Sequence, residues 1–129
     1  MSKYQAKFTV IKSNIDQLNH VNNVVYVEWI QDIANQHWNQ LKEGYDTSNY
    51  IWVVIKHEID YLGQALLGDQ IEASTWVGET GGIKSVRHVE FYKNQTLLVK
   101  AKTTFCLLNA TSFKPSRITD TILKMLSRK

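Results

Sequence analysis

The fold is decided by one stretch, from Asp16 to Trp29, which reads DQLNHVNNVVYVEW. Its first half is polar, whereas apolar side chains from Asn23 onward return at the three- and four-residue spacing of a helix. Asn22 or Asn23 is a suitable N-cap, because an asparagine side chain accepts a hydrogen bond from an N–H group of the first turn. The sequence therefore predicts a loop that leads into a helix starting near Asn23.

The helical pattern continues for about 20 residues, a usual length for a helix of a globular protein. One side of it carries Tyr26, Ile30, Ile33, His37 and Leu41, and the other side is mostly charged and amide residues. Lys42 and Gly44 supply the positive charge and the glycine that commonly end a helix. We expect this to be the one long helix of the chain, packed against a sheet.

Two reactive side chains precede the helix, the Asp16 carboxylate and the His20 imidazole, four residues apart. The first N–H groups of a helix have no partner within the helix, and its N-terminus carries a partial positive charge. Such a terminus can polarise a carbonyl group while a nearby carboxylate attacks the carbonyl or activates water. This arrangement favours an acyl-transfer site.

The rest of the chain alternates apolar and polar residues, as strands do. The expected strands cover residues 3–12, 50–62, 71–79, 84–93 and 97–108, and a short helix is expected near Thr121–Leu126. In the second strand the alternation places Ile55 and His57 on one face and Trp52 on the other. One strand, a long helix and then four strands indicate an antiparallel α+β fold.

Length and composition indicate a single globular domain over residues 1–129. No apolar run has the roughly 20 residues needed to cross a bilayer, and the N-terminus lacks the apolar block of a signal peptide. We therefore expect a cytoplasmic protein. The single cysteine, Cys106, excludes an internal disulfide and a cysteine-rich metal site, and no metal or redox cofactor is expected.

Charge is distributed unevenly along the chain. Residues 1–64 contain five Lys/Arg and seven Asp/Glu, whereas residues 65–129 contain ten and five. A basic second half fits an anionic partner, which could be nucleic acid, a membrane surface or a phosphorylated ligand. Lysines that protect sheet edges would give the same pattern. Charge alone leaves these alternatives open.

An aspartate four residues before His-Val-Asn-Asn, with a tyrosine one helical turn later, resembles the hotdog-fold acyl-thioesterases. The nearest relatives are the 4-hydroxybenzoyl-CoA thioesterase-like enzymes and the plant acyl-ACP thioesterases. The residues that carry the resemblance are Asp16, His20, Val21, Asn22, Asn23, Tyr26 and Trp29, with weaker support from Asp60, Tyr61, Gly68, Asp69, Lys84 and Ser85. The resemblance extends over residues 4–118. It implies a hotdog fold, in which a five-stranded antiparallel sheet wraps around one long helix.

The resemblance also implies roles for individual residues. In the 4-hydroxybenzoyl-CoA type, the aspartate matching Asp16 attacks the thioester or activates water, and the backbone N–H matching Asn23 polarises the carbonyl. The residue matching His20 is needed for activity in several relatives. The match to the plant enzymes has gaps, because Leu18 stands where they have an asparagine and Gln64 where they have a catalytic glutamate. The implied activity is hydrolysis of an acyl-CoA thioester to a free acid and CoA.

Binding residues follow from the same resemblance and from the charges of CoA. Asn22 and Tyr26 are expected at the substrate, and Lys84-Ser85 matches a nucleotide-contacting position. Phosphate groups attract lysine and arginine, which adds Arg87, Lys114 and Arg117 as candidates. Lys84 and Arg87 are three residues apart on a strand and point to opposite faces, so Lys84 is the stronger candidate and Arg87 is assigned to a neighbouring subunit.

A homodimer or homotetramer is expected, because a single copy would leave strand edges and a sheet face exposed. In this interpretation the partner is an acyl-CoA, and neither nucleic acid nor a membrane is involved. Two other function classes remain. A hotdog hydratase or dehydratase also uses Asp, His or Glu as acid and base, and a non-catalytic acyl-CoA binding protein could use the same tunnel.

Each candidate also has a purely structural interpretation. Asp16 suits a turn, in which its carboxylate accepts backbone N–H bonds. His20 could brace the loop, and Tyr26 suits packing under a sheet. Asn22 and Asn23 suit helix caps. Among the other side chains, His57 is expected to be a core histidine and Cys106 a small buried residue, while His37 and His88 have no evident partner in the sequence.

Overall fold

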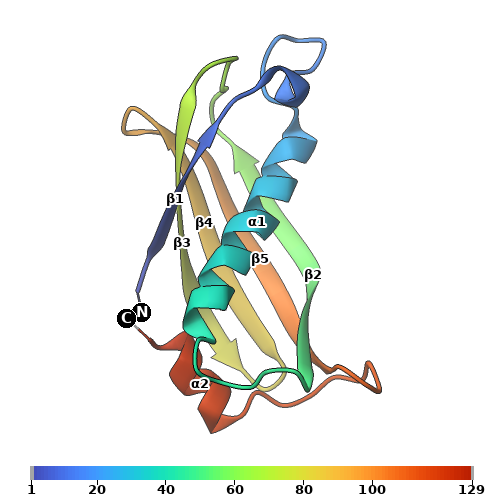
Figure 1. Ribbon diagram of the computed structural model, residues 1–129. Coiled ribbons are helices and arrows are strands. Elements are labelled where there is room, and N and C mark those ends of the chain that lie inside the picture. The colour runs from blue at the N-terminus through green and yellow to red at the C-terminus, as the bar shows by residue number, and fades with distance from the viewer. Residues whose placement is uncertain (1, 129) are drawn as a thin grey trace.

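The computed structural model describes residues 2–128, which form one five-stranded sheet and two α-helices. In chain order the elements are β1 (Tyr4–Thr9), the 3-10 turn η1 (Lys12–Asn14), α1 (Asn23–Leu41), β2 (Tyr50–Tyr61), β3 (Gln70–Gly81), β4 (Lys84–Lys93), β5 (Thr96–Asn109) and α2 (Asp120–Leu126). Neighbouring strands are all antiparallel and follow the spatial order β1-β3-β4-β5-β2 (Figure 1). The predicted α+β fold is confirmed.

The long helix α1 crosses one face of the curved sheet, which we call the inner face (Figure 1). It begins at Asn23, as the sequence predicts, and has 19 residues. Its sheet-facing side buries Val25, Tyr26, Trp29, Ile30, Ile33, Ala34, His37 and Leu41. Each large apolar side chain among these contributes about 1.5–3 kcal/mol on burial, which is why packing rather than propensity holds this helix.

A row of polar side chains crosses the inner face and separates two apolar clusters. Arg87 on β4 is opposite Thr103 on β5, which in turn is opposite His57 on β2. Thr103 and Thr75 are fully buried, and Arg87 is only 6% exposed. Apolar residues pack on one side of this row around Tyr26, Ile30 and Phe91, and on the other side around Leu41, Leu107 and Met125. The interior is therefore not a continuous apolar core.

A β-bulge changes the faces expected for β2. Val54 is opposite Phe105 and Lys56 is opposite Thr104, which leaves Ile55 without a partner across the ladder. The extra residue reverses the alternation, so that Trp52 and His57 both face inward and Ile55 is 50% exposed. The prediction that Ile55 and His57 share a face opposite to Trp52 is wrong for this reason.

The two ends of the molecule are made of different segments. At one end, which we call the loop end, the segment before α1 lies against the loop after β2. The Val21 N–H joins the two by donating to the Ala65 carbonyl at 2.9 Å. At the other end, the tail end, α2 packs below the C-terminus of α1 beside the β3–β4 turn, where Ile118 N–H donates to the Gly82 carbonyl at 2.8 Å (Figure 1).

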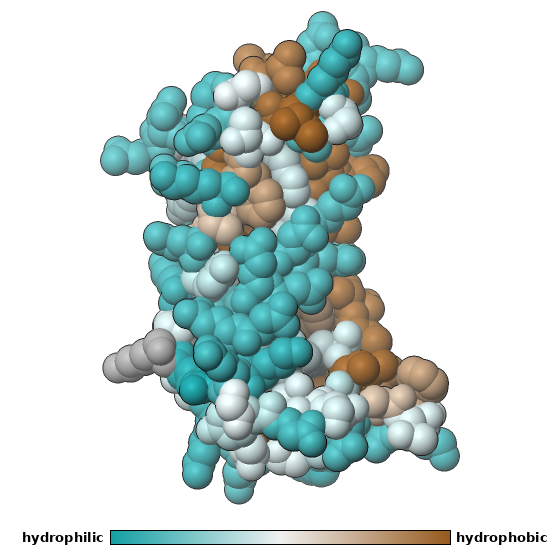
Figure 2. All heavy atoms as spheres, viewed as in Figure 1, coloured by the Kyte–Doolittle hydropathy of each residue, from teal (hydrophilic) through white to brown (hydrophobic). Residues whose placement is uncertain are grey.

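The long outer strand β2 is an open edge of the sheet. Apolar side chains gather along the side of the molecule where Figure 1 places β2, whereas the outward side of α1 is hydrophilic (Figure 2). Exposed apolar residues in this region include Val24, Ile55, Tyr61 and Leu62. Within residues 2–128, neither helix has the length and apolar character needed to span a membrane.

Candidate active site

The loop before α1 is a closed turn. The Asp16 N–H donates to the His20 carbonyl at 3.1 Å, and the Asn19 N–H donates to the Asp16 carbonyl at 3.1 Å. Asn19 has φ of 63°, a left-handed conformation that asparagine tolerates better than most residues. A short bridge between Ile15 and Val21 closes the turn. The loop is therefore held by its own backbone, and the side chains of Asp16 and His20 leave it from fixed positions.

The Asp16 carboxylate is half-buried and partly engaged. Its Oδ1 accepts a hydrogen bond from the Leu18 N–H at 2.8 Å, which is the turn-forming role expected of an aspartate. The carboxylate lines an open hollow together with Ile15, Gln17, Leu18 and Asn22. This bond occupies Oδ1, whereas Oδ2 accepts no hydrogen bond from the described residues.

His20 faces a second hollow, of about 330 Å³, at the N-terminus of α1. The hollow is lined by His20, Val21, Asn23, Tyr26, Tyr61, Leu62, Gly63 and Gln64. The Nδ1 atom of His20 lies 3.2 Å from the Val21 carbonyl, so Nδ1 is the donor in that contact, and Nε2 makes no hydrogen bond to the described residues. The side chains of Asp16 and His20 therefore line neighbouring hollows, and the only hydrogen bond between the two residues is the backbone bond that closes the turn.

The start of α1 leaves one N–H group available. The Asn22 side chain accepts a hydrogen bond from the Val24 N–H at 3.0 Å, and the Val25 N–H donates to the Asn22 carbonyl at 2.9 Å. No acceptor within residues 2–128 takes the Asn23 N–H, which belongs to a residue lining the hollow. Asn22 is thus the N-cap, and Asn23 presents the donor that a polarised carbonyl oxygen would require.

Two tyrosines lie beside this donor. The Tyr61 hydroxyl lies 3.4 Å from the Asn23 carbonyl and donates to it. The Tyr26 hydroxyl is buried and has no hydrogen-bond partner among the described residues. Burial, together with the nearby Tyr61 and Asp69, raises the pKa of Tyr26 to about 12. Tyr26 is therefore neutral near pH 7, and an unpaired buried hydroxyl is rare enough to need an explanation.

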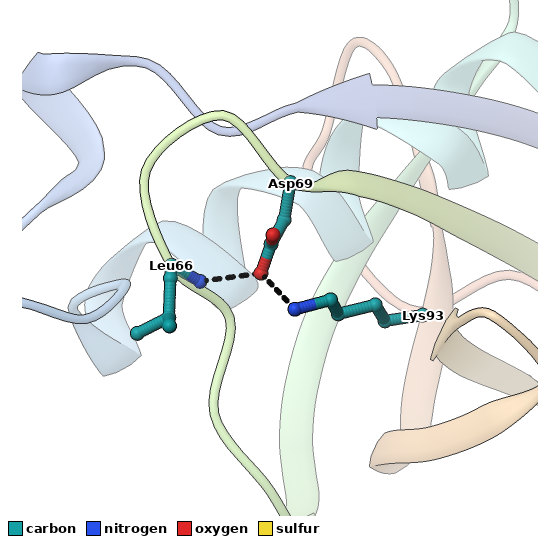
Figure 3. Close-up of polar contacts among 3 residues, drawn as sticks. All are labelled: Leu66, Asp69 and Lys93. Atoms are coloured by element: carbon teal, nitrogen blue, oxygen red, sulfur yellow. Dashed lines mark hydrogen bonds and ion pairs between the residues drawn. The ribbon is translucent and has the colours of Figure 1, made fainter.

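The loop after β2 forms the other wall of the hollow and is braced by Asp69. The Asp69 Oδ2 atom accepts a hydrogen bond from the Leu66 N–H at 2.8 Å and pairs with the Lys93 ammonium at 2.8 Å (Figure 3). The hydrogen bond from Lys93 is the main cause that lowers the pKa of Asp69. The resemblance pointed to Asp69, but its contact with Lys93 joins residues distant in the sequence and could not be predicted.

The basic candidates on the tail end are far from this loop. Lys84 begins β4 directly after the β3–β4 turn, where it is opposite Gly81 and Cys106. Lys114 and Arg117 flank a bridge between Pro115 and Leu108 at the end of β5. All three belong to the tail end, whereas Asp16, His20, Asn22, Asn23 and Tyr26 belong to the loop end (Figure 1). One copy of the chain does not bring the two groups together.

Arg87 and Ser85, which are candidates for contacts with the phosphates of CoA, are buried in one copy of the chain. Both are 6% exposed and lie on the inner face, under α1. The Arg87 guanidinium donates to Nδ1 of His37 at 2.7 Å and to the Thr75 hydroxyl at 3.1 Å, and the Ser85 hydroxyl bonds that of Thr80 at 2.7 Å. In one copy of the chain both side chains therefore lie beneath α1 and line a cavity there. Their contact with the phosphates of CoA stays a prediction.

Comparison with known proteins identifies the family. The model of the acyl-ACP thioesterase N-terminal domain matches residues 1–126. Curated protein sequences give no match. Among solved structures, a predicted thioesterase from Bacillus stearothermophilus superimposes with a TM-score of 0.87 at 20% sequence identity, over 97% of this chain and 94% of that chain.

Two further structures have the same fold. A 1,4-dihydroxy-2-naphthoyl-CoA thioesterase from Synechocystis has a TM-score of 0.83 at 10% identity, over 97% of this chain and 96% of that one. A probable thioesterase from Escherichia coli has a TM-score of 0.82 at 20% identity, over 96% and 98%. At such identities the structures establish the fold alone, which is the predicted hotdog fold. Because the family model covers nearly all of the sequence, the chain belongs to the acyl-ACP thioesterase family and is a thioester hydrolase.

Proposed function

We propose that the protein is an acyl-CoA thioesterase with its reacting groups at the loop end. The observation that carries the proposal is the Asn23 N–H, which has no acceptor within residues 2–128 and belongs to a residue that lines one hollow with His20, while Asp16 lines the neighbouring hollow with the N-cap Asn22. A free donor at the positive end of a 19-residue helix suits a developing oxyanion. Removal of one such donor typically costs about 10²–10³-fold in turnover.

The reaction needs no group beyond water. The thioester carbonyl oxygen accepts the Asn23 N–H bond, and Asp16 either attacks the carbonyl carbon or takes a proton from the attacking water. If Asp16 attacks, the C–S bond breaks to leave a mixed anhydride between the acyl group and Asp16, which one water then hydrolyses; if Asp16 acts as base, water adds to the carbonyl and the C–S bond breaks directly. In both cases the thiolate leaves and takes up a proton that comes from the water, and the acyl group is released as a carboxylic acid. His20, whose Nε2 makes no hydrogen bond to the described residues, lines the hollow beside the Asn23 N–H and would bond the substrate or the water there.

A CoA thioester is favoured over an acyl carrier protein by two features of the sequence. Leu18 and Gln64 replace an asparagine and a glutamate of the plant acyl-ACP enzymes, and Gln64 lines the hollow with His20. The basic second half of the chain supplies Lys84, Lys114 and Arg117 for the phosphates of CoA.

A homodimer through β2 would join the two ends. A second copy that pairs antiparallel with the open edge of β2 would cover Ile55 and continue the sheet. In that pairing Tyr50 of one copy approaches Tyr61 of the other. The tail end of one copy, with Lys84, would then adjoin the Asp16 loop of the other. Ile55→Asp should therefore disrupt the dimer, and analytical ultracentrifugation should detect a monomer. That monomer should have lost thioesterase activity.

The direct test is thiol release from aliphatic and aromatic acyl-CoAs, compared with the same acyl groups on acyl carrier protein. Rapid release from CoA thioesters supports the proposal, and release from the carrier protein alone overturns the choice of CoA. A change in enoyl absorbance without thiol release would instead identify a hydratase or dehydratase. Saturable binding of acyl-CoA without turnover would identify a binding protein.

A further inference from the structure

A cavity separate from the two loop-end hollows lies under the C-terminal half of α1, between that helix and strands β2, β4 and β5. It has a volume of about 270 Å³ and is lined by Ala34, Asn35, Trp38, Tyr50, Ile51, Trp52, Ser85, Arg87, Phe105 and Leu126. We call it the Arg87 cavity. Its walls are largely aromatic and aliphatic, and Trp38 and Trp52 meet edge to face with ring centroids 5.9 Å apart. None of the residues at the loop-end hollow lines it.

Among the described residues that line this cavity, Arg87 is the one with a charged side chain. A single nitrogen, Nη1, makes both of its hydrogen bonds, to His37 and to Thr75. Within residues 2–128 Arg87 forms no ion pair with a carboxylate. The other two guanidinium nitrogens make no hydrogen bond to the described residues. They are nevertheless not completely buried, so a small molecule can reach them. They are therefore the donors that remain for the cavity.

Neither neighbour can neutralise this charge. Burial, and then the charge of Arg87, lowers the pKa of His37 to about 4, so the imidazole is neutral near pH 7. Its Nδ1 accepts from Arg87, and the Tyr4 ring stacks on its face at 5.4 Å. Burial lowers the pKa of Arg87 only to about 10, so the guanidinium stays charged. A buried cation without a counter-ion is unfavourable, and an anion in the cavity would relieve that cost.

We propose that the Arg87 cavity binds a carboxylate carried on an apolar body. The free nitrogens of Arg87 would hold the carboxylate in the forked geometry that guanidinium groups favour. Trp38, Trp52 and Phe105 would enclose the apolar part. A dry cavity of about 150 Å³ accepts a molecule of the size of benzene, so a cavity of about 270 Å³ has room for an aromatic acid or a medium-chain fatty acid.

Such a carboxylate has two possible sources. It can be a free organic acid, or it can be the far carboxylate of a dicarboxylic acyl thioester whose reacting end lies at the loop-end hollow of the second copy in the proposed dimer. Only the second source depends on the proposed thioesterase function. The free-acid site would exist whether or not the protein hydrolyses CoA thioesters.

The first experiment compares charged and neutral ligands of equal shape on the wild-type protein. Octanoate and octanamide, and benzoate and benzamide, are titrated by calorimetry and by the fluorescence of Trp38 and Trp52. We expect each carboxylate to bind about tenfold or more tightly than its amide, the range of a charge-assisted hydrogen bond. Equal affinities, or no binding of either carboxylate, would overturn the proposal without the need for any variant.

Variants then identify the group that binds. Arg87→Met keeps the bulk and removes the charge, and should abolish the preference for carboxylate over amide. Arg87→Lys keeps the charge without the fork and should restore it in part. Lys102→Met, an exposed lysine on β5, removes the same charge outside the cavity and should leave the preference unchanged. A preference that survives in folded Arg87→Met protein would contradict the assignment.

A kinetic comparison separates the two sources. Suberyl-CoA and octanoyl-CoA have acyl chains of equal length, and only the first ends in a carboxylate. A higher kcat/KM for suberyl-CoA that disappears in Arg87→Met supports the thioester source. Equal kcat/KM values, together with tight octanoate binding, support the free-acid source. Octanoate binding without hydrolysis of any thioester would disprove the proposed function and leave the Arg87 cavity standing.

Discussion

The backbone N–H of Asp16 donates a hydrogen bond to the carbonyl of His20 at 3.1 Å. This bond closes the turn between the two residues, so their side chains diverge toward separate hollows on either side of the helix start. A substrate that lies across the N-terminus of α1 could therefore be approached by the carboxylate from one side and by the imidazole from the other. Because the two side chains line separate hollows, the role proposed for each can be tested by mutating one at a time.

Asp16→Asn should lower turnover by about 10²-fold or more, because it removes the negative charge required of a nucleophile or general base. The asparagine can still accept the Leu18 N–H bond, so the turn and the fold should be retained. Asp46→Asn is the matched control, since Asp46 makes the same kind of bond to the Ser48 N–H at 3.0 Å in a different loop. The measurement is thiol release under single-turnover conditions. Folded Asp16→Asn protein with wild-type turnover would refute the role.

His20→Ala should lower kcat more than it raises KM, because the free Nε2 is expected to act on the substrate or the water during the reaction. The control is His88→Ala, whose ring stacks on Trp76 at 5.4 Å on the outer face of the sheet. It should leave both constants unchanged. If His20→Ala raised KM alone, the imidazole would belong to substrate binding.

The hydrogen bonds of the loop end could be predicted from the sequence because they join residues that are close together in the chain. The cap by Asn22 and the turn bond of Asp16 both join residues two apart, and the side-chain types identify them. The Arg87–His37 bond joins residues 50 apart, on a strand and a helix whose pairing no local pattern determines. The bulge at Ile55 was missed for a related reason, since the alternation of β2 reads equally well with or without an extra residue.

Lys84→Ala should raise KM for acyl-CoA and barely change turnover of an acyl-pantetheine thioester, which lacks the phosphates. The wild-type KM for acyl-CoA should also rise with ionic strength, because exposed phosphate contacts are screened by salt. Lys102→Ala is the control, as an exposed lysine opposite Glu58 and His88 near the middle of the sheet. An equal effect of Lys84→Ala on both substrates would exclude a phosphate contact.

Stability should fall as the pH drops from about 6.5 toward 4, and His37 should account for part of the fall. The folded protein keeps His37 neutral, with a pKa of about 4 against an ordinary value of 6.5. The unfolded chain therefore binds a proton that the folded chain does not, so stability rises with pH inside this window and is lost as pH decreases. The slope from one such group is at most about 1.4 kcal/mol per pH unit.

The check is urea denaturation of wild type and His37→Gln at pH 7 and pH 5. Glutamine can still accept the Arg87 bond through its side-chain oxygen but does not titrate. We expect a smaller loss of stability at pH 5 in the variant. An identical loss in both proteins would show that other groups, such as the partly buried His57, carry the whole pH dependence.

Tyr26→Phe should change stability and activity in opposite directions. The Tyr26 hydroxyl is buried without a partner within residues 2–128, and an unsatisfied buried group costs about 1–3 kcal/mol. Its removal should therefore leave the protein as stable or more stable in thermal denaturation.

If the hydroxyl bonds the thioester or the attacking water, the same change should lower kcat several-fold or more. Tyr61→Phe removes only a long bond of 3.4 Å to the Asn23 carbonyl and should have a smaller effect on kcat. A stabilised Tyr26→Phe protein with wild-type kcat would mean that the ring packs in the core and its hydroxyl takes no part in the reaction.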